Sequence, residues 1–538
     1  MDYLKIGKAT DLSGKERKLY RKLEMLPAFL SWSTLIGLIL LSYFFPVKVA
    51  FFVIAFDVYW LLLVFFLGIY LLVAYRKMQK NIKVNWEEKC INLEESFGKY
   101  EKIISENLGR DKKYKERKDI PLKYKYKWTD IYNLVVLPTY NEGLDIIEPT
   151  IDAIVRDNFP KDKMIILYAV EERGGKEAIE RARYVKEKYG HNFMDFIISV
   201  HPDGIEGELK GKGANQAWAA KVVREELIDK KQLDYKKILV SVFDIDTIIR
   251  RGYFHNLLYT FLTVENAYRA SYQPVPVYHN NIWQSPFFAR MAASSNTFWQ
   301  MMQQIRQEKL ATYSSHSMTW QALVDIGFWS TKMVSEDSRI FWHCFCYYKG
   351  DYRVEPMNFP VSMDVCVGKT KLETARNLYM QQRRWGWGVE NVPYLIFNTM
   401  KDWKNIPKGK FIGRILVQIY GFHSWGTNAL IIAVVGWMPM ILGGDRFNST
   451  VLSGNLPAVT RTLMTLAMAG LVLSAILSTM ILPKKPKDLR FRKYISMVGQ
   501  WILLPFSIVI FGAIPGLEAQ TRLMFGKYMG FWVTPKSR

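Results

Sequence analysis

The sequence predicts an α/β domain built on a parallel sheet and enclosed between membrane-spanning helices at the two ends of the chain. Between residues 133 and 243, short apolar runs alternate with stretches that have helical spacing. This alternation is typical of parallel strands that are joined by helices. Long apolar stretches lie on both sides of the region, and a stretch of about 20 apolar residues is long enough to cross a bilayer.

The apolar stretches predict the membrane helices and the division of the chain. Residues 25–45 and 49–74 form the expected N-terminal hairpin, and further spans are expected near 424–442, 459–482 and 495–516. The expected parts are a cytoplasmic N-terminal segment, a transmembrane hairpin, a connecting segment, an α/β domain with interfacial helices, a C-terminal membrane region and a cytoplasmic tail. Their ranges are 1–24, 25–74, 75–130, 131–410, 411–520 and 521–538.

Basic residues beside the spans predict the orientation, because short basic flanks stay in the cytoplasm. Clusters of Lys and Arg lie at 15–22, 76–83 and 484–493, whereas the connections 46–48 and 443–458 have almost none. We therefore expect a multi-pass protein of the inner or plasma membrane whose α/β domain is cytoplasmic. A cytoplasmic tail requires an even number of crossings after residue 410, although three apolar segments are expected there.

Charge and cysteine content argue against two classes of site. Much of the net charge of +23 lies beside the membrane segments, where Lys and Arg contact anionic headgroups. Membrane lipids are therefore expected partners, and nucleic acid is not. The four cysteines show no CxxC spacing and lie in the expected cytoplasmic region, so the sequence supports neither a zinc site nor a disulfide framework.

Two aspartates at a strand end are the first candidate ligands. Asp244 and Asp246 follow the apolar run 238–243, and ligands of parallel sheets gather beyond the carboxyl ends of strands. Carboxylate oxygens suit Mg²⁺ or Mn²⁺. Asp246 is the first metal-ligand candidate, and Asp244 is placed to bind the nucleoside or the same metal. The alternative is that both aspartates merely cap the following segment.

An acidic pair further along the chain is the candidate catalytic group. Glu336 and Asp337 follow Ser335, and a carboxylate can take the proton of an attacking hydroxyl as a general base. We assign that role to Asp337, with Glu336 orienting the acceptor or the base. The pair could equally begin a helix, with Ser335 as its cap.

Three further segments offer contacts for phosphates and sugars. In the run 381–385, Gln381, Arg383 and Arg384 can donate to diphosphate oxygens, and Trp385 offers a face for a sugar, although Arg and Trp also anchor proteins at membrane interfaces. The basic loop 207–215, with Lys212, suits phosphates or a nucleobase as well as it suits an ordinary surface loop. The end of the chain, 531–536, would by itself be a disordered tail.

This ordered set resembles the membrane-embedded family 2 glycosyltransferases, which include cellulose synthase and hyaluronan synthase. The resemblance covers about Val135 to Trp385, the membrane pattern and the tail. It implies a GT-A catalytic domain inserted between the N- and C-terminal transmembrane helices. Ser335-Glu336-Asp337 is similar to the TED motif of the family, with Ser in place of Thr.

The resemblance also implies a role for each motif. The strand 135–142, with Thr139, Tyr140 and Glu142, forms part of the nucleotide pocket, and Glu171 or Glu172 takes the place of the usual base-binding Asp; we assign Glu171. Gln381, Arg384 and Trp385 match QxxRW, which holds the diphosphate and meets the acceptor. The tail matches the gating-loop pattern FxVTxK, which closes over the donor, at Phe531, Val533, Thr534 and Lys536.

The sequence therefore predicts an inverting, metal-dependent glycosyltransferase. We expect it to extend a β-linked polysaccharide from a nucleotide-diphosphate sugar, UDP-linked rather than GDP-linked, with translocation of the product as a further expectation. The acceptor is a glycan or a glycolipid, and no protein partner is identified. One alternative adds a single sugar to a lipid or polyprenyl phosphate. An alternative of another class is a transporter with a nucleotide-binding regulatory domain.

Overall fold

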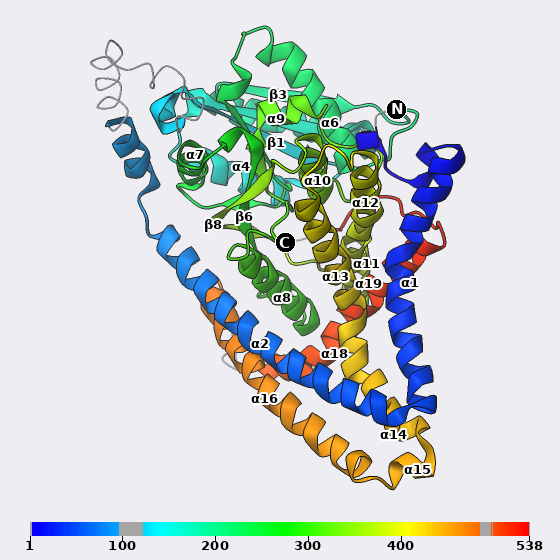
Figure 1. Cartoon of the computed structure of the whole chain (residues 1–538). Helices are drawn as coiled ribbons and strands as arrows, with labels where there is room; N and C mark the ends of the chain where they lie inside the picture. Colours follow the sequence, from blue (N-terminus) through cyan, green and yellow to red (C-terminus); the bar gives the residue numbers. More distant parts are fainter. Residues whose placement is uncertain (1–2, 96–121, 485–496, 498, 537–538) are drawn as a thin grey trace, which may run out of the picture.

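The computed structural model describes residues 3–95, 122–484, 497 and 499–536 (Figure 1). Its α/β domain lies at one end of a bundle of long helices, and the two chain ends return to that domain. The connecting segment expected at 75–130 and the basic flank at 484–493 lie partly outside the described residues.

One sheet of eight strands forms the centre of the α/β domain, in the order β3-β2-β1-β4-β7-β6-β8-β5. β1 to β4 pair in parallel, as the alternating pattern predicts. β6 and β8 also pair in parallel, but β7 pairs antiparallel with both β4 and β6, and β5 pairs antiparallel with β8, so the other half of the sheet is mixed. The strands are β1 Tyr132–Thr139, β2 Met164–Glu171, β3 Asp195–His201, β4 Ile238–Val242, β5 Ile248–Ile249, β6 Ala270–Tyr278, β7 Ser317–Thr319 and β8 Arg353–Met363.

Helices cover both faces of the parallel half, which explains why its strands are apolar throughout. Successive residues of β1 alternate between two cores: Val135 and Leu137 pack in one, and Leu134 and Val136 pack in the other. The first core is covered by α4 Leu144–Arg156, α5 Lys176–Tyr189 and α7 Tyr253–Thr263. The second is covered by α6 Lys212–Val223, α9 Trp320–Asp325, α10 Glu336–Tyr347 and α12 Asn391–Lys401.

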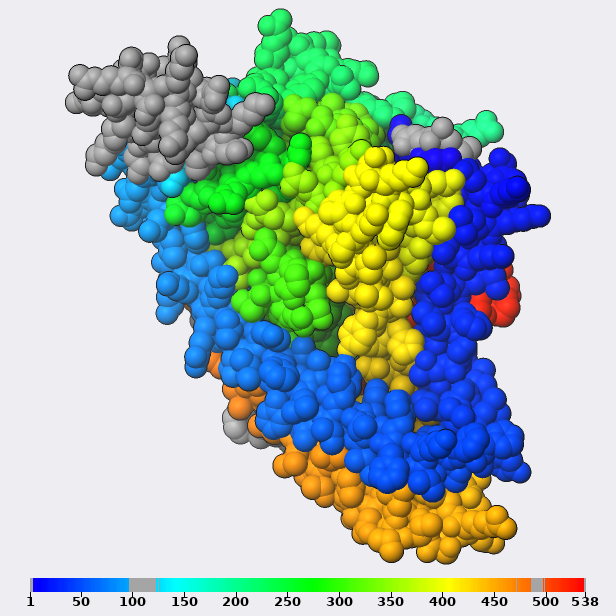
Figure 2. Space-filling model, in the orientation of Figure 1, coloured from blue at the N-terminus to red at the C-terminus, as the bar shows by residue number. Residues whose placement is uncertain are grey.

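Within the residues that the structure describes, four helical segments are long and apolar enough to cross a membrane. They are α1 Gly14–Phe44, α2 Pro46–Ile82, α16 Val451–Ile481 and the stretch Gln500–Met524, which includes α18 Leu504–Ile508 and α19 Ile514–Met524. A fifth apolar pair, α13 Lys408–Ala433 with the stretch Val435–Leu442 that ends in α14 Met438–Leu442, is bent by 44°. The expected spans all coincide with these segments. Figure 2 shows α2 and α16 in contact along one edge of the molecule.

The position of the tail constrains the number of crossings. Lys536 binds Asp246 at the end of the sheet, so the tail and the α/β domain lie on the same side of any membrane that the helices cross. The chain must then cross an even number of times between the domain and the tail. Among the described residues, three apolar segments lie in that interval, namely the bent pair within 408–442, α16 and Gln500–Met524, so an even number requires that one of the three does not cross.

We expect Asn215→Leu to destabilise the parallel half of the sheet. Asn215 is fully buried on α6, and its amide donates to the carbonyl oxygens of Ala169 (2.8 Å) and Thr139 (3.4 Å) at the ends of β2 and β1. Loss of these bonds leaves two buried acceptors short of a donor, at a cost of about 1–3 kcal/mol. Thermal unfolding in detergent should show a Tm several degrees lower, and Lys221→Leu on the exposed face of the same helix should not.

Candidate functional site

The ammonium of Lys212 is the centre of the candidate site. It lies 2.8 Å from Oδ1 of Asp244, 2.9 and 3.0 Å from the two oxygens of Asp337, and 3.7 Å from Oε1 of Glu336. Lys212 is the first residue of α6, Asp244 follows β4, and the acidic pair begins α10. The structure therefore brings together three segments that the sequence separates by more than 100 residues in all.

Burial and charge set the protonation of this cluster. Burial alone would lower the pKa of Lys212, but Asp244, Asp337 and Glu336 outweigh it and raise that pKa above its usual range. Burial also opposes ionisation of Asp244, yet Lys212 and Lys536 hold its pKa below the usual range. Burial, followed by the charge of Asp337, raises the pKa of Glu336 to about 8. The carboxyl of Glu336 therefore keeps its proton at neutral pH.

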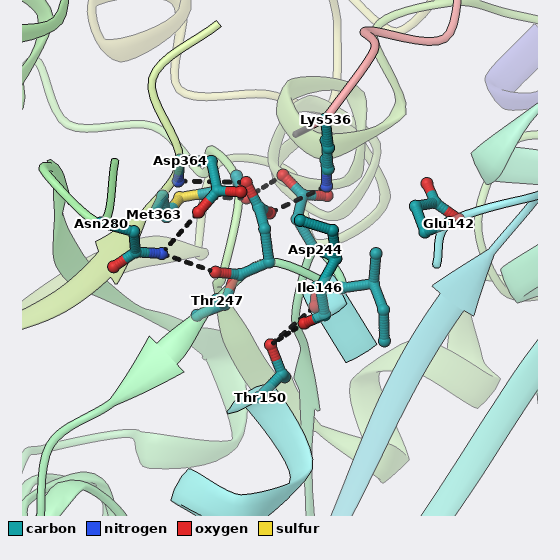
Figure 3. Close-up of polar contacts among 12 residues, drawn as sticks. Glu142, Ile146, Thr150, Asp244, Thr247, Asn280, Met363, Asp364 and Lys536 are labelled. Carbon is teal, nitrogen blue, oxygen red and sulfur yellow. Dashed lines mark hydrogen bonds and ion pairs between the residues drawn. The ribbon is translucent and has the colours of Figure 1, made fainter. Parts of the chain in front are cut away.

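The backbone around the two aspartates is fixed on several sides (Figure 3). Thr150 on α4 donates to the carbonyl of Ile245 at 2.6 Å, and Asn280 donates to the carbonyl of Asp246 at 3.0 Å. Ser314 donates to Oδ2 of Asp244 at 2.5 Å. The backbone N–H of Asp364, after β8, donates to Oδ2 of Asp246 at 3.1 Å. These bonds aim the two carboxylates into the site and do not cap a helix.

The C-terminal tail enters the same cluster. Nζ of Lys536 lies 2.8 Å from Oδ1 of Asp246, and Figure 3 places Glu142 on the other side of this lysine from Asp364. Phe531 packs against Gly211 and lies 5.1 Å from the guanidinium carbon of Arg384. Val533 is half-buried, and the hydroxyl of Thr534 is buried without a hydrogen-bond partner.

Glu336 and Asp337 lie at a helix N-terminus, as the sequence predicts for the alternative in which the pair begins a helix. Glu336 and Asp337 form the first turn of α10, although Ser335 makes no capping bond with its side chain. Arg339, one turn further on, is buried and donates to the side chain of Asn391 at 2.7 Å and to the carbonyl of Ile6 at 2.8 Å. The helix that carries the candidate base is thus held by α12 and by the N-terminal segment.

The helix α11 Lys371–Gly386 presents the QxxRW residues with different environments. Arg384 lies near Glu336, and its Nε is buried without a hydrogen-bond partner. Trp385 contacts Tyr278, with ring centroids 6.0 Å apart. Arg383 forms a 2.7 Å ion pair with Glu518 of α19. Gln381 is half-buried.

The residues at the ends of β1 and β2 form a second, adjoining region. Thr139 donates to the carbonyl of Ala169, and Glu142 accepts from the backbone N–H of Tyr140 at 2.8 Å. Tyr140 lies under the guanidinium of Arg173, which also pairs with Glu171. Glu171 and Arg173 line an open pocket of about 390 Å³. Its other walls come from His201, Asp203, Gly204, Ile205, Glu208, Leu209 and Lys210.

The donor set at Asp244 and Asp246 fits a divalent cation that a ligand helps to hold. The ammonium of Lys536 stands at Asp246 in the place of a cation. Within the described ranges, no group of three or more His, Cys, Asp or Glu side chains forms a preassembled metal cage. A hard cation that takes only two carboxylates from the protein completes its shell with water or phosphate oxygens.

Sequence reasoning missed the residues that support the site. Ser314, Asn280 and Asp364 hold the two aspartates, and Glu518 holds Arg383. Asp364 lies just after a strand, which is the same feature that identified Asp244. The others have no local pattern that would have found them. Trp387 is buried and donates to Glu390 at 2.9 Å, so it is not an interfacial anchor.

Comparison with solved structures finds distant neighbours. A mannosyltransferase from Pyrobaculum calidifontis in complex with GDP-Man and Mn²⁺ is 14% identical over 79% of this chain and 99% of its own, with a TM-score of 0.42. TarS 1–349 from S. aureus is 10% identical over 65% and 91%, with a TM-score of 0.34. GalNAc-T7 with UDP, GalNAc and Mn²⁺ is 10% identical over 57% of each chain, with a TM-score of 0.28.

These neighbours are glycosyltransferases, but likenesses with TM-scores below 0.5 carry no argument for this chain. No family model matches the sequence. No curated protein matches it either.

We expect Lys212→Met to destabilise the protein because it leaves three carboxylates without the charge that they share. Removal of one partner from a buried ion pair costs about 3–5 kcal/mol. In the wild type, the lowered pKa of Asp244 contributes stability above the ordinary Asp range and loses it as the pH falls. The Tm difference from wild type, measured with EDTA, should therefore be large at pH 7.5 and should shrink only below the ordinary Asp range, as the pH falls toward 2. Lys221→Met serves as the exposed control, and an equal difference at both ends of this range would contradict the ion-pair account.

Glu336→Gln should change the pH dependence of stability in the opposite sense. The raised pKa of Glu336 keeps its proton in the folded state up to about pH 8, whereas the unfolded chain releases it near the ordinary Glu value. The raised pKa of Glu336 therefore stabilises the folded wild type below the ordinary Glu pKa, and this stabilisation is lost as the pH rises toward 8. The Tm advantage of Glu336→Gln, in EDTA, should grow from pH 5 to pH 8 and then level off. A constant difference would show that Glu336 is ionised throughout.

Proposed function

We propose that this chain is a membrane-embedded family 2 glycosyltransferase with a GT-A catalytic domain, and that it transfers a sugar from a nucleotide diphosphate with inversion. The observation that carries the proposal is the convergence of Asp244, Asp246 and Asp337 around Lys212, with Arg384 and the C-terminal tail beside them. Each belongs to a motif that the sequence presents in the order of that family. If the cluster served only to hold the fold together by ion pairs, it would not need a buried donor without a partner on Arg384.

Asp337 acts as the general base. It must be ionised to accept the acceptor's hydroxyl proton as the oxygen attacks the anomeric carbon. Lys212 stabilises that ionised form at 2.9 Å, and the neighbouring Glu336 holds a proton and so adds no second negative charge. Transfer of the hydroxyl proton to Asp337 then weakens its attraction to Lys212. Lys212 is left to stabilise Asp244 and the negative charge of the leaving group.

The donor lies along the ends of β1, β2 and β4. Arg384 would donate its free Nε to the diphosphate, and Thr534 would donate its hydroxyl when the tail closes over the bound donor with Lys536 away from Asp246. Asp246 and Asp244 would hold Mg²⁺ or Mn²⁺, which as a Lewis acid stabilises the charge of the departing diphosphate. The open pocket at Glu171 and Arg173 receives the nucleobase, for which UDP is favoured over GDP.

The acceptor meets the site at Trp385. Its ring contacts Tyr278, next to the aspartates, and an aromatic face of this kind stacks on a sugar ring. The catalytic domain is cytoplasmic, and the acceptor is a growing β-linked polysaccharide that the same chain moves across the membrane. The second candidate function is the transfer of a single sugar to a lipid or polyprenyl phosphate. The contact of α19 with α11, which carries Arg384, also suits a lipid acceptor.

Release of nucleoside diphosphate by the purified full-length chain in nanodiscs tests the proposal. With a panel of UDP- and GDP-sugars, Mg²⁺ or Mn²⁺, and lipid or oligosaccharide acceptors, we expect donor-selective release that EDTA abolishes. Asp337→Asn should lower the rate by about 100-fold or more while donor binding is retained. Asp351→Asn, at an exposed ion pair with Arg269, is the matched control.

The products separate the candidates. A ladder of long products indicates a polysaccharide synthase, and one sugar on an extractable lipid indicates single transfer. Donor binding without turnover, with every acceptor tried, would contradict the transferase and favour the transporter with a nucleotide-binding domain.

A further inference from the structure

The C-terminal tail occupies the place where the site would bind its cation. Nζ of Lys536 lies 2.8 Å from Oδ1 of Asp246, and both side chains are largely buried, at 16% and 5% exposed. A divalent cation binds a carboxylate oxygen at about 2.0–2.2 Å. An ammonium and a cation cannot share this oxygen, because the two positive charges would lie almost in contact.

Charge balance explains why the tail is drawn into the site. Asp244 is neutralised by Lys212, and Asp246 by Lys536. Glu142, on the side of Lys536 away from Asp364, also attracts this ammonium. Lys536 thus supplies a positive charge directly at Asp246.

The root of the tail is fixed to the first membrane helix. Arg21 of α1 donates to the carbonyl of Leu523 at 2.8 Å and also to that of Met524. Tyr528 donates to Glu24 at 2.8 Å, and the other oxygen of this buried carboxylate accepts from the backbone of Ala9. These bonds hold the chain up to Tyr528, so any departure from Asp246 is confined to the residues after it.

One ring and one ion pair are the main contacts of the outer tail, and Met529 packs beside them. Phe531 fills the space beside Gly211, where a Cβ would come within 2.6 Å of its ring. Arg384 lies over the same ring, and Lys536 makes the ion pair. Gly530 precedes the ring, and a Cβ there would meet nothing within 4 Å. Such an attachment can be released without disturbance of the sheet.

We propose that Lys536 is a built-in competitor of the divalent cation, so that the outer tail must leave Asp246 before the cation can bind there. The proposal rests on the proposed function for the role of Asp246 as a cation ligand. It also explains why the root of the tail is fixed. The fixed root keeps Lys536 at a high local concentration near Asp246. It also predicts that the cation binds more tightly when the tail is unseated.

Mn²⁺ binding by the full-length protein in nanodiscs, without nucleotide, tests this competition. Free Mn²⁺ is measured by its EPR signal, which needs no turnover. If the tail is seated about nine-tenths of the time, Lys536→Met should bind Mn²⁺ about tenfold more tightly than wild type. Phe531→Ala keeps every charge but removes the packing at Gly211, and it should also bind more tightly. Lys527→Met, at an exposed lysine of the same tail, is the control for the loss of one positive charge.

The outcomes separate the two proposals. Tighter binding in both Lys536→Met and Phe531→Ala, with Lys527→Met unchanged, supports the competitor. Tighter binding in Lys536→Met alone is a charge effect and overturns it, as does no change in either variant. Asp246→Asn tests the cation site itself: if this variant binds Mn²⁺ as wild type does, the cation site of the proposed function is wrong. If Asp246→Asn loses binding while the tail variants equal the control, only the competitor is wrong.

Discussion

The site depends on one buried ammonium that three carboxylates share. Asp244, Glu336 and Asp337 come from different elements, and their charges would repel one another if all were ionised without a partner. Lys212 prevents this from the first position of α6, where Gly211 (φ 154°) turns the chain into the helix. The same ammonium therefore holds β4, α6 and α10 together at their ends.

The second lysine gives Asp246 a positive partner from within the chain. With Lys212 at Asp244 and Lys536 at Asp246, each of the two aspartates lies against an ammonium. If the tail leaves, as we propose, a cation takes the place of Lys536. A carboxylate pair that has positive partners in both arrangements avoids the large cost of a bare buried charge.

The sequence identified the residues of the site better than it identified their partners. Asp244, Glu336, Arg384 and Lys536 lie in short motifs at strand or helix ends, and these are local features. The sheet was half predicted, because β5 and β7 are two and three residues long and show no periodicity. Ion pairs between distant segments leave no local trace. The ion pair of Arg383 with Glu518 is an example.

That ion pair connects the membrane helices to the chemistry. Glu518 on α19 accepts from Tyr379 and Arg383 of α11 at 2.6 and 2.7 Å, and α11 also carries Arg384. Since α19 continues into the tail, a shift of α19 would move both the arginine and the lysine of the site. Arg21 and Glu24 oppose such a shift by holding the end of α19 and Tyr528 against α1. Contacts with α1 thus hold the end of α19 and Tyr528, so any movement of the tail that the proposed function needs is confined to the few residues beyond Tyr528.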